Sequence, residues 1–139
     1  MEIPSSLIGG TVSRGDVLLS AFEGINHPKF FVVMGISQDK ICGFFFINSN
    51  VNKYLFGKNE LLAMQYPLRH CEYEFLRHDS FLCASDVKEM PLTDIAEGIK
   101  NGNVDIIGRL KENDIENILE MVNNSPVIRK IHKKRYFQR

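Results

Sequence analysis

Polar side chains that can transfer protons or bind phosphate gather at the ends of two apolar runs. One run covers residues 29–34 and the other covers residues 41–47. The polar residues at their outer ends are His27, Lys29, Asn48, Ser49 and Asn50. Histidine can act as an acid or a base near neutral pH, lysine can neutralise a phosphate as a point charge, and hydroxyl and amide groups can donate hydrogen bonds. If the protein has a chemical site, we expect it at this rim, although the same residues can simply begin a strand and cap a turn.

A second polar cluster, Arg77-His78-Asp79-Ser80, interrupts a stretch of strand character over residues 70–87. A histidine beside an acid can be a tuned acid or base. Asp and Ser can equally form a turn in which their side chains bind the backbone. We favour the turn, because neighbours in sequence point to opposite sides of a strand. His78 and Arg77 are kept as candidate site residues.

The cysteines and histidines do not have the spacing of a metal site. Cys42, Cys71 and Cys83 are odd in number and scattered, which is typical of reduced thiols. His70 stands directly before Cys71, where adjacent side chains diverge, and the chain has no CxxC-type pair. We expect neither a metal ion nor a cofactor.

The elements that must position these residues are short strands followed by helices. Strands are expected at residues 17–22, 29–34, 41–47, within 70–87, and at 104–110. Helices are expected at residues 92–101 and 111–122, the second with an apolar stripe of Ile115, Ile118, Leu119 and Val122. This order predicts an α+β fold that is mainly β, a small antiparallel barrel of five to six strands with a C-terminal amphipathic helix.

Composition indicates a single globular domain with little bulk charge. The 139 residues are 44% hydrophobic and 24% charged, and the formal net charge is zero. Bulk attraction to nucleic acid or to an anionic membrane is therefore not implied. The charge is uneven, since residues 126–139 contain six Lys or Arg and no Asp or Glu. We divide the chain into a lead-in over residues 1–13, a barrel domain over 14–125, and a basic tail or helix over 126–139, which is either solvated or a contact for phosphate or an acidic partner.

The sequence gives no sign of secretion or membrane insertion. Residues 1–10 have neither a basic start nor a long apolar core. No segment approaches the ~18 uninterrupted apolar residues of a membrane span. We expect a cytoplasmic protein without a membrane contact.

The order of motifs resembles the MazF/PemK-like toxin family. The chain opens with Gly15-Asp16-Val17-Leu18-Leu19, continues with the two apolar runs, and closes with Gly108-Arg109-Leu110 before the amphipathic helix. The resemblance covers residues 14–125. It implies an SH3-like barrel, shared with the CcdB-type toxins, metal-independent cleavage of single-stranded RNA, and an antitoxin protein as partner.

The resemblance points to Lys29 and Asn48-Ser49 as site residues, and the acid and base that RNA cleavage without a metal requires add His27 and His78 as candidates. The family usually has an Arg-Pro pair at the head of the second strand and a Thr or Ser after the third, and this chain has Pro28-Lys29 and Asn48-Ser49 there. The candidate catalytic residues are Lys29, Ser49, His27 and His78. The candidate RNA-binding residues are Asn48, Asn50 and Arg77.

Two further hypotheses concern partners. The same barrel can instead be a non-catalytic module that binds a protein or a nucleic acid. Three consecutive phenylalanines, Phe44 to Phe46, place at least one ring on each face of their strand. Both faces must therefore be covered, which favours a homodimer or a partner against the barrel.

Overall fold

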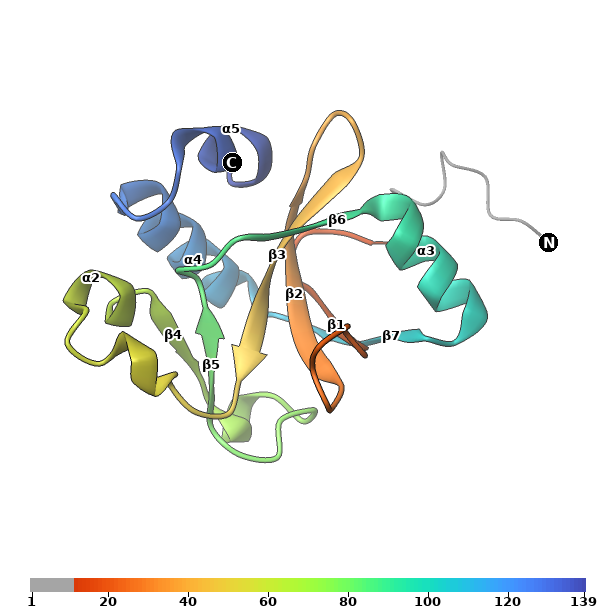
Figure 1. The fold of residues 1–139 in the computed structure, drawn as a ribbon, viewed down its shortest axis with the longest axis horizontal. Helices are drawn as coiled ribbons and strands as arrows, with labels where there is room; N and C mark the ends of the chain where they lie inside the picture. Colours follow the sequence, from red (N-terminus) through yellow and green to blue (C-terminus); the bar gives the residue numbers. More distant parts are fainter. Residues whose placement is uncertain (1–11) are drawn as a thin grey trace.

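A computed structural model describes residues 12–139, which fold around one antiparallel sheet (Figure 1). The sheet order is β4-β5-β3-β2-β1-β7, and β6 pairs with β3 beside this path. The strands are β1 (Asp16–Ser20), β2 (Lys29–Ile36), β3 (Ile41–Asn48), β4 (Gln65–Leu68), β5 (Ser80–Cys83), β6 (Lys88–Pro91) and β7 (Val104–Arg109). The α+β class expected from the sequence is confirmed.

The expected strand count of five to six is wrong, because the described residues form seven strands. The additional short strands, β4 and β6, each contain a proline and polar residues, so they lack the apolar runs that mark a buried strand. The expected barrel is not confirmed. In the described part of the chain, β4 and β7 end the sheet and do not pair with each other.

The long hairpin of β2 and β3 forms the centre of the sheet. Its turn is held by Ser37, whose Oγ accepts a hydrogen bond from the Ile41 amide at 3.0 Å and donates one to Asp39 Oδ1 at 2.8 Å. Lys40 completes the turn in the left-handed region, with φ of 62°. The predicted hairpin is therefore present, with both strands extended at their ends beyond the expected ranges.

Helices cover both faces of this sheet (Figure 1). They are η1 (Lys53–Leu55), α2 (Asn59–Leu62), η2 (His70–Glu72), α3 (Leu92–Asn101), α4 (Glu112–Asn124) and α5 (Lys130–Tyr136). The predicted apolar stripe of α4 is confirmed, since Ile115, Ile118, Leu119 and Val122 are all buried. Within residues 12–139, no helix has the length and apolar character needed to cross a membrane.

Alternating residues of β2 and β3 enter two separate cores. Val32 and Phe45 face α4 and α5, whereas Phe31 and Phe44 face α3. The chain itself therefore buries Phe44 and Phe45 on opposite faces of the sheet. The dimer was expected because both faces of this strand need to be covered, and one molecule covers them by itself. A homodimer stays a prediction.

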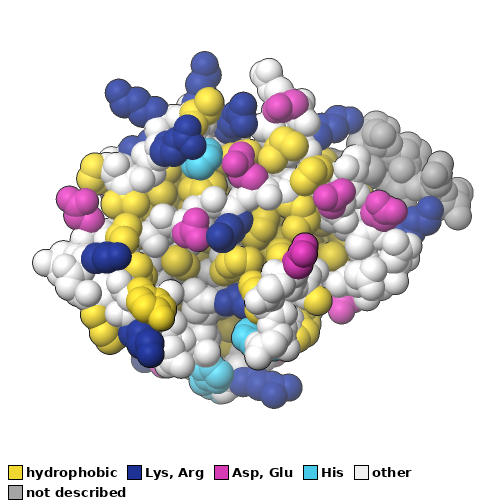
Figure 2. Space-filling model, in the orientation of Figure 1, with side chains coloured by type: hydrophobic (Ala, Val, Ile, Leu, Met, Phe, Trp, Pro, Cys, Tyr) yellow, Lys and Arg dark blue, Asp and Glu magenta, His cyan; other side chains and the backbone are white. Residues whose placement is uncertain are grey.

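The basic segment 126–139 packs Ile128, Tyr136 and Phe137 into the main core. Phe137 stacks on Phe45 with ring centroids 5.5 Å apart and an interplanar angle of 6°. The Arg14 guanidinium donates to the carbonyl oxygens of Met34, Tyr136 and Gln138 at 2.6, 3.0 and 2.7 Å. Figure 2 shows Lys and Arg side chains gathered over α5, so the helix buries its aromatic residues and exposes its charges.

Two glycines make room for this docking. A Cβ built on Gly35 would lie 2.1 Å from the Tyr136 carbonyl oxygen. A Cβ on Gly43 would lie 2.4 Å from the Tyr136 ring. These glycines face each other across the β2–β3 pair, so only the absence of side chains there allows α5 to approach.

Phe137→Ala and Phe56→Ala make a matched test of whether residues 126–139 belong to the core. Phe137 is 0% exposed and Phe56 is 66% exposed. We expect Phe137→Ala to lower the free energy of unfolding by about 3–5 kcal/mol, because it leaves a cavity in the core. Phe56→Ala should change it by less than about 0.5 kcal/mol. Urea denaturation measures both, and equal small effects would contradict the packing described.

Candidate functional site

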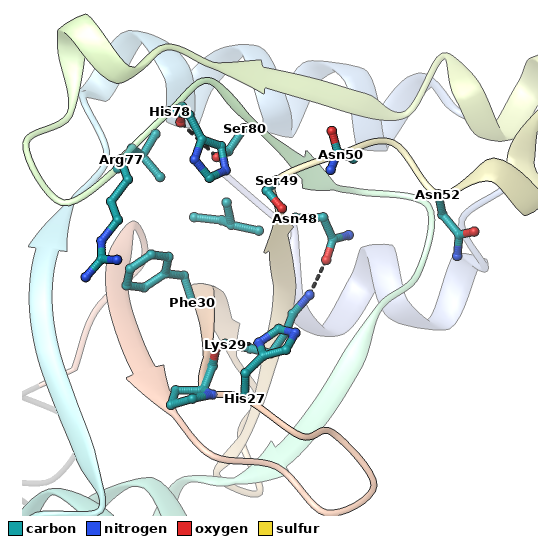
Figure 3. Close-up of a pocket in the computed structure, with 13 residues that line it drawn as sticks. His27, Lys29, Phe30, Asn48, Ser49, Asn50, Asn52, Arg77, His78 and Ser80 are labelled. Carbon is teal, nitrogen blue, oxygen red and sulfur yellow. Dashed lines mark hydrogen bonds between the residues drawn. The ribbon is translucent and has the colours of Figure 1, made fainter.

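The candidate residues from the sequence meet in one pocket. This pocket, here called the cationic pocket, has a volume of about 450 Å³ and lies where β2 begins and β3 ends (Figure 3). All seven candidates line it, namely His27, Lys29, Asn48, Ser49, Asn50, Arg77 and His78. The sequence reasoning missed six other lining residues, Pro28, Phe30, Ile47, Asn52, Leu76 and Ser80. Most of these are apolar or lie beside a predicted site residue, so no chemical signal marked them.

The pairing of β3 with its two neighbours assembles the walls. In the antiparallel β2–β3 ladder, Phe30 is opposite Ile47, so Lys29 comes beside Asn48. Lys29 Nζ donates a hydrogen bond to Asn48 Oδ1. On its other edge, β3 pairs with β5, where Asn48 is opposite Phe81. The loop that precedes β5 is thereby brought next to Ser49, although it is far from it in sequence.

Lys29 is the most constrained cation of the pocket. Its side chain is half-buried, and Nζ lies 5.1 Å from the centre of the Phe46 ring. Burial lowers the pKa of Lys29 below the ordinary value of 10.5, because the charged form loses solvation. Among residues 12–139, no carboxylate forms a salt bridge with Lys29. Its charge is therefore available to an anionic ligand.

Arg77 and His78 sit on a closed turn before β5. Asp79 Oδ1 accepts a hydrogen bond from the His70 amide at 2.8 Å, and His70 Nδ1 lies 2.6 Å from the Leu76 carbonyl oxygen. Ser80 Oγ donates to the His78 carbonyl oxygen at 3.0 Å. The predicted turn is confirmed, and Asp79 binds the backbone. The strand character expected over residues 70–87 is confirmed only at β5, since polar side chains close the preceding residues into η2 and this turn.

Tyr73 fastens the same loop to α4. Its hydroxyl donates to Asp114 and accepts a hydrogen bond from the Lys111 amide at 2.9 Å. The Tyr66 hydroxyl donates to the other Asp114 oxygen at 2.5 Å. Burial and the Asp114 hydrogen bond raise the pKa of both tyrosines. The loop carrying Arg77 is therefore anchored to the helix that packs under the sheet.

The lining of the cationic pocket suits an anion. Lys29 and Arg77 supply cations, and His27 and His78 supply exposed imidazoles. None of its thirteen lining residues is Asp or Glu. Ser49 and the asparagines add neutral hydrogen-bond donors, which stabilise charge on phosphate oxygens. In residues 12–139, no three His, Cys, Asp or Glu side chains are grouped so that they could hold a metal ion.

Known families give no match for this chain. No family model matches it, and no curated protein matches it. The resemblance to the MazF/PemK-like toxins therefore stays a prediction.

The lowered pKa of Lys29 predicts how anion binding depends on pH. Phosphate affinity should fall as pH rises through this lowered pKa, hence below 10.5, because the ammonium loses its proton there. The unfolded chain holds that proton more tightly, so the contribution of Lys29 to folding stability rises with pH over the same range. NMR titration with inorganic phosphate measures the affinity. Lys29→Arg, which stays charged, should bind phosphate with a flat profile, and a flat profile in the parent would contradict the role of Lys29.

Asp79→Ala tests whether the turn positions Arg77 and His78. Losing the acceptor of the His70 amide should lower the free energy of unfolding by about 1 kcal/mol and shift the amide resonances of Arg77 and His78. Asp79→Asn keeps Oδ1 and should leave both quantities close to those of the parent. Denaturation and ¹⁵N NMR spectra provide the measurements. Unchanged resonances in Asp79→Ala would show that the turn holds without this bond.

Proposed function

We propose that this protein is a cytoplasmic, MazF/PemK-like endoribonuclease of toxin type, which cuts single-stranded RNA without a metal ion. The observation that carries the proposal is the cationic pocket, which combines two cations and two imidazoles and has no carboxylate in its lining. An RNA phosphodiester carries one negative charge and offers oxygens that need donors. A hydrogen-bonding, carboxylate-free pocket supplies these requirements.

The proposed reaction uses the 2′-hydroxyl of the RNA as nucleophile. Its oxygen attacks phosphorus, the bond from phosphorus to O5′ breaks, and the products are a 2′,3′-cyclic phosphate and a 5′-hydroxyl. One imidazole, from His27 or His78, takes the 2′-hydroxyl proton, and the other gives a proton to O5′. Lys29 neutralises the charge that develops on the phosphate oxygens, and Ser49 donates to them.

The remaining candidates bind the RNA on either side of this phosphate. Arg77 is exposed at the mouth of the pocket, where its planar guanidinium can hold two phosphate oxygens. Asn48 ends β3, Asn50 follows two residues later, and both line the pocket. An antitoxin protein and a second copy of the chain are the partners that the resemblance suggests.

Lys29→Ala tests the proposal directly. Purified protein should cut varied single-stranded RNAs in the presence of EDTA, and Lys29→Ala should slow cleavage by about 10²–10³-fold, because it removes the cation facing the developing charge. Lys100→Ala, an exposed position of α3, is the matched control and should cut like the parent. Gel analysis of end-labelled RNA measures the rates.

The outcome also separates the proposal from the binding-module alternative. RNAs left intact by the parent protein, or cut equally by Lys29→Ala, would contradict the enzyme. RNA that is bound but not cut would identify the cationic pocket as a phosphate-binding module. In cells, overexpression should arrest growth, and Lys29→Ala should restore it.

A further inference from the structure

A second pocket adjoins the cationic pocket and shares two walls with it. Here called the Phe46 pocket, it has a volume of about 290 Å³, and Asn48 and Asn52 line both pockets. The Lys29 ammonium marks the boundary, since it binds Asn48 and lies over the Phe46 ring. The two pockets therefore meet at Asn48 and Asn52.

The charge of the Phe46 pocket differs from that of its neighbour. Its only cation within the described lining is Lys88, whose Nζ forms a salt bridge with Asp86 at 3.0 Å. A phosphate gains little here, because the Asp86 carboxylate offsets the Lys88 charge. The ring of Phe46 and the side chain of Leu55 add apolar surface. The Nζ atoms of Lys29 and Lys88 lie 5.1 and 5.9 Å from the centre of the Phe46 ring, so the Phe46 pocket suits a neutral ligand whose acceptor atoms can face these ammonium groups.

The polar groups of the Phe46 pocket offer both donors and acceptors. Asn48 Oδ1 is occupied by Lys29, and Asn52 Oδ1 accepts from the Tyr54 amide at 2.9 Å. Neither side-chain NH₂ group donates a hydrogen bond within the described residues, so both amides can donate to a ligand. The Asp86 carboxylate, which is 61% exposed, can accept. Donors and acceptors around an apolar surface match the edge of a nucleobase.

The loop that forms one side of the Phe46 pocket continues this surface outward. It connects β3 to α2 and contains Asn52 and Leu55, and it exposes 74% of Tyr54 and 66% of Phe56. Exposed aromatic rings are platforms on which successive bases of a single strand can stack. The position of these rings beside the Phe46 pocket favours an RNA strand as the ligand.

We infer that the Phe46 pocket binds the base of the nucleotide next to the phosphate in the cationic pocket. The inference rests on the proposed RNA-binding function and adds a subsite to it. Asn48 then separates the two subsites, one for the phosphate and one for the base. The occupant is an unpaired base, because a paired base would present its edge to the other strand.

The experiment uses dinucleotides that cannot be cut. The intact ligand is two 2′-O-methyl cytidines joined by one phosphodiester. It is compared with inorganic phosphate, with the dinucleotide that lacks only its first base, and with the dinucleotide that lacks only its second base. ¹⁵N NMR of the full chain reports on each pocket separately, through Ser49 and His78 for the cationic pocket and Ser85 and Lys88 for the Phe46 pocket. We expect every ligand to shift the amide resonances of Ser49 and His78. Only dinucleotides that keep the base bound in the Phe46 pocket should also shift those of Ser85 and Lys88.

Ser85→Phe fills the Phe46 pocket without changing the cationic pocket. It should weaken binding of the intact dinucleotide by about tenfold, which is the order of one base–aromatic contact, and leave phosphate affinity unchanged. If Ser85→Phe does not fold, Leu55→Trp fills the same space from the exposed loop. Asn101→Phe, which adds the same ring at an exposed position of α3, is the control and should bind like the parent.

The outcomes separate this inference from the proposed function. Absence of any shift at Ser49 and His78 with phosphate or dinucleotide would overturn the proposed function and the subsite together. Shifts at the cationic pocket alone, or equal dinucleotide affinity in the parent and the filled variant, would overturn only the subsite. The subsite is supported if removing one specific base lowers the affinity of the parent for the dinucleotide, and if removing that base causes no further loss of affinity in Ser85→Phe.

Discussion

The hydrogen-bond register between β2 and β3 is the constraint on which both the core and the site depend. With Phe31 opposite Phe46 and Val32 opposite Phe45, alternating side chains enter two separate cores. The same register brings Lys29 beside Asn48 at the open end of the hairpin. A shift by one residue would exchange the two faces and separate this pair, so the packing of the phenylalanines and the chemistry of the pocket are set together.

A second constraint is the close approach of α5 to this hairpin. Gly35 and Gly43 leave no side chains where Tyr136 docks, and the ring of Phe137 then stacks on Phe45. The Tyr136 hydroxyl donates to Glu89 of β6 at 2.5 Å, and Arg14 holds the following carbonyls. The C-terminal segment thus connects β2, β3 and β6 on the face of the sheet opposite α3. In the sequence, the many charged residues of α5 give no indication of this role.

The sequence predicted the hairpin, the α+β class and seven of the thirteen residues that line the pocket, because each depends on local pattern. Apolar runs of β-branched and aromatic residues mark β2 and β3, and polar residues at their ends mark the rim. The strands β4 and β6 were not predicted, because each contains a proline, Pro67 or Pro91, and polar residues. Such residues are found in strands at the margin of a sheet, and position in the sheet cannot be read from local sequence. Asp114 lies in the first turn of α4, and its carboxylate binds Tyr66 and Tyr73, a contact across the fold that spacing in sequence does not encode.

The stacking of Phe137 on Phe45 also orders events during synthesis. Phe45 belongs to an early hairpin, while residues 136 and 137 follow every strand and α4 in the chain. Until they emerge from the ribosome, the face of β2 and β3 under α5 remains uncovered, and the hydrophobic core is incomplete. The lip of the cationic pocket is built on this same hairpin. A chain that ends before residue 136 therefore carries all the residues of the pocket on a hairpin whose α5 face is uncovered.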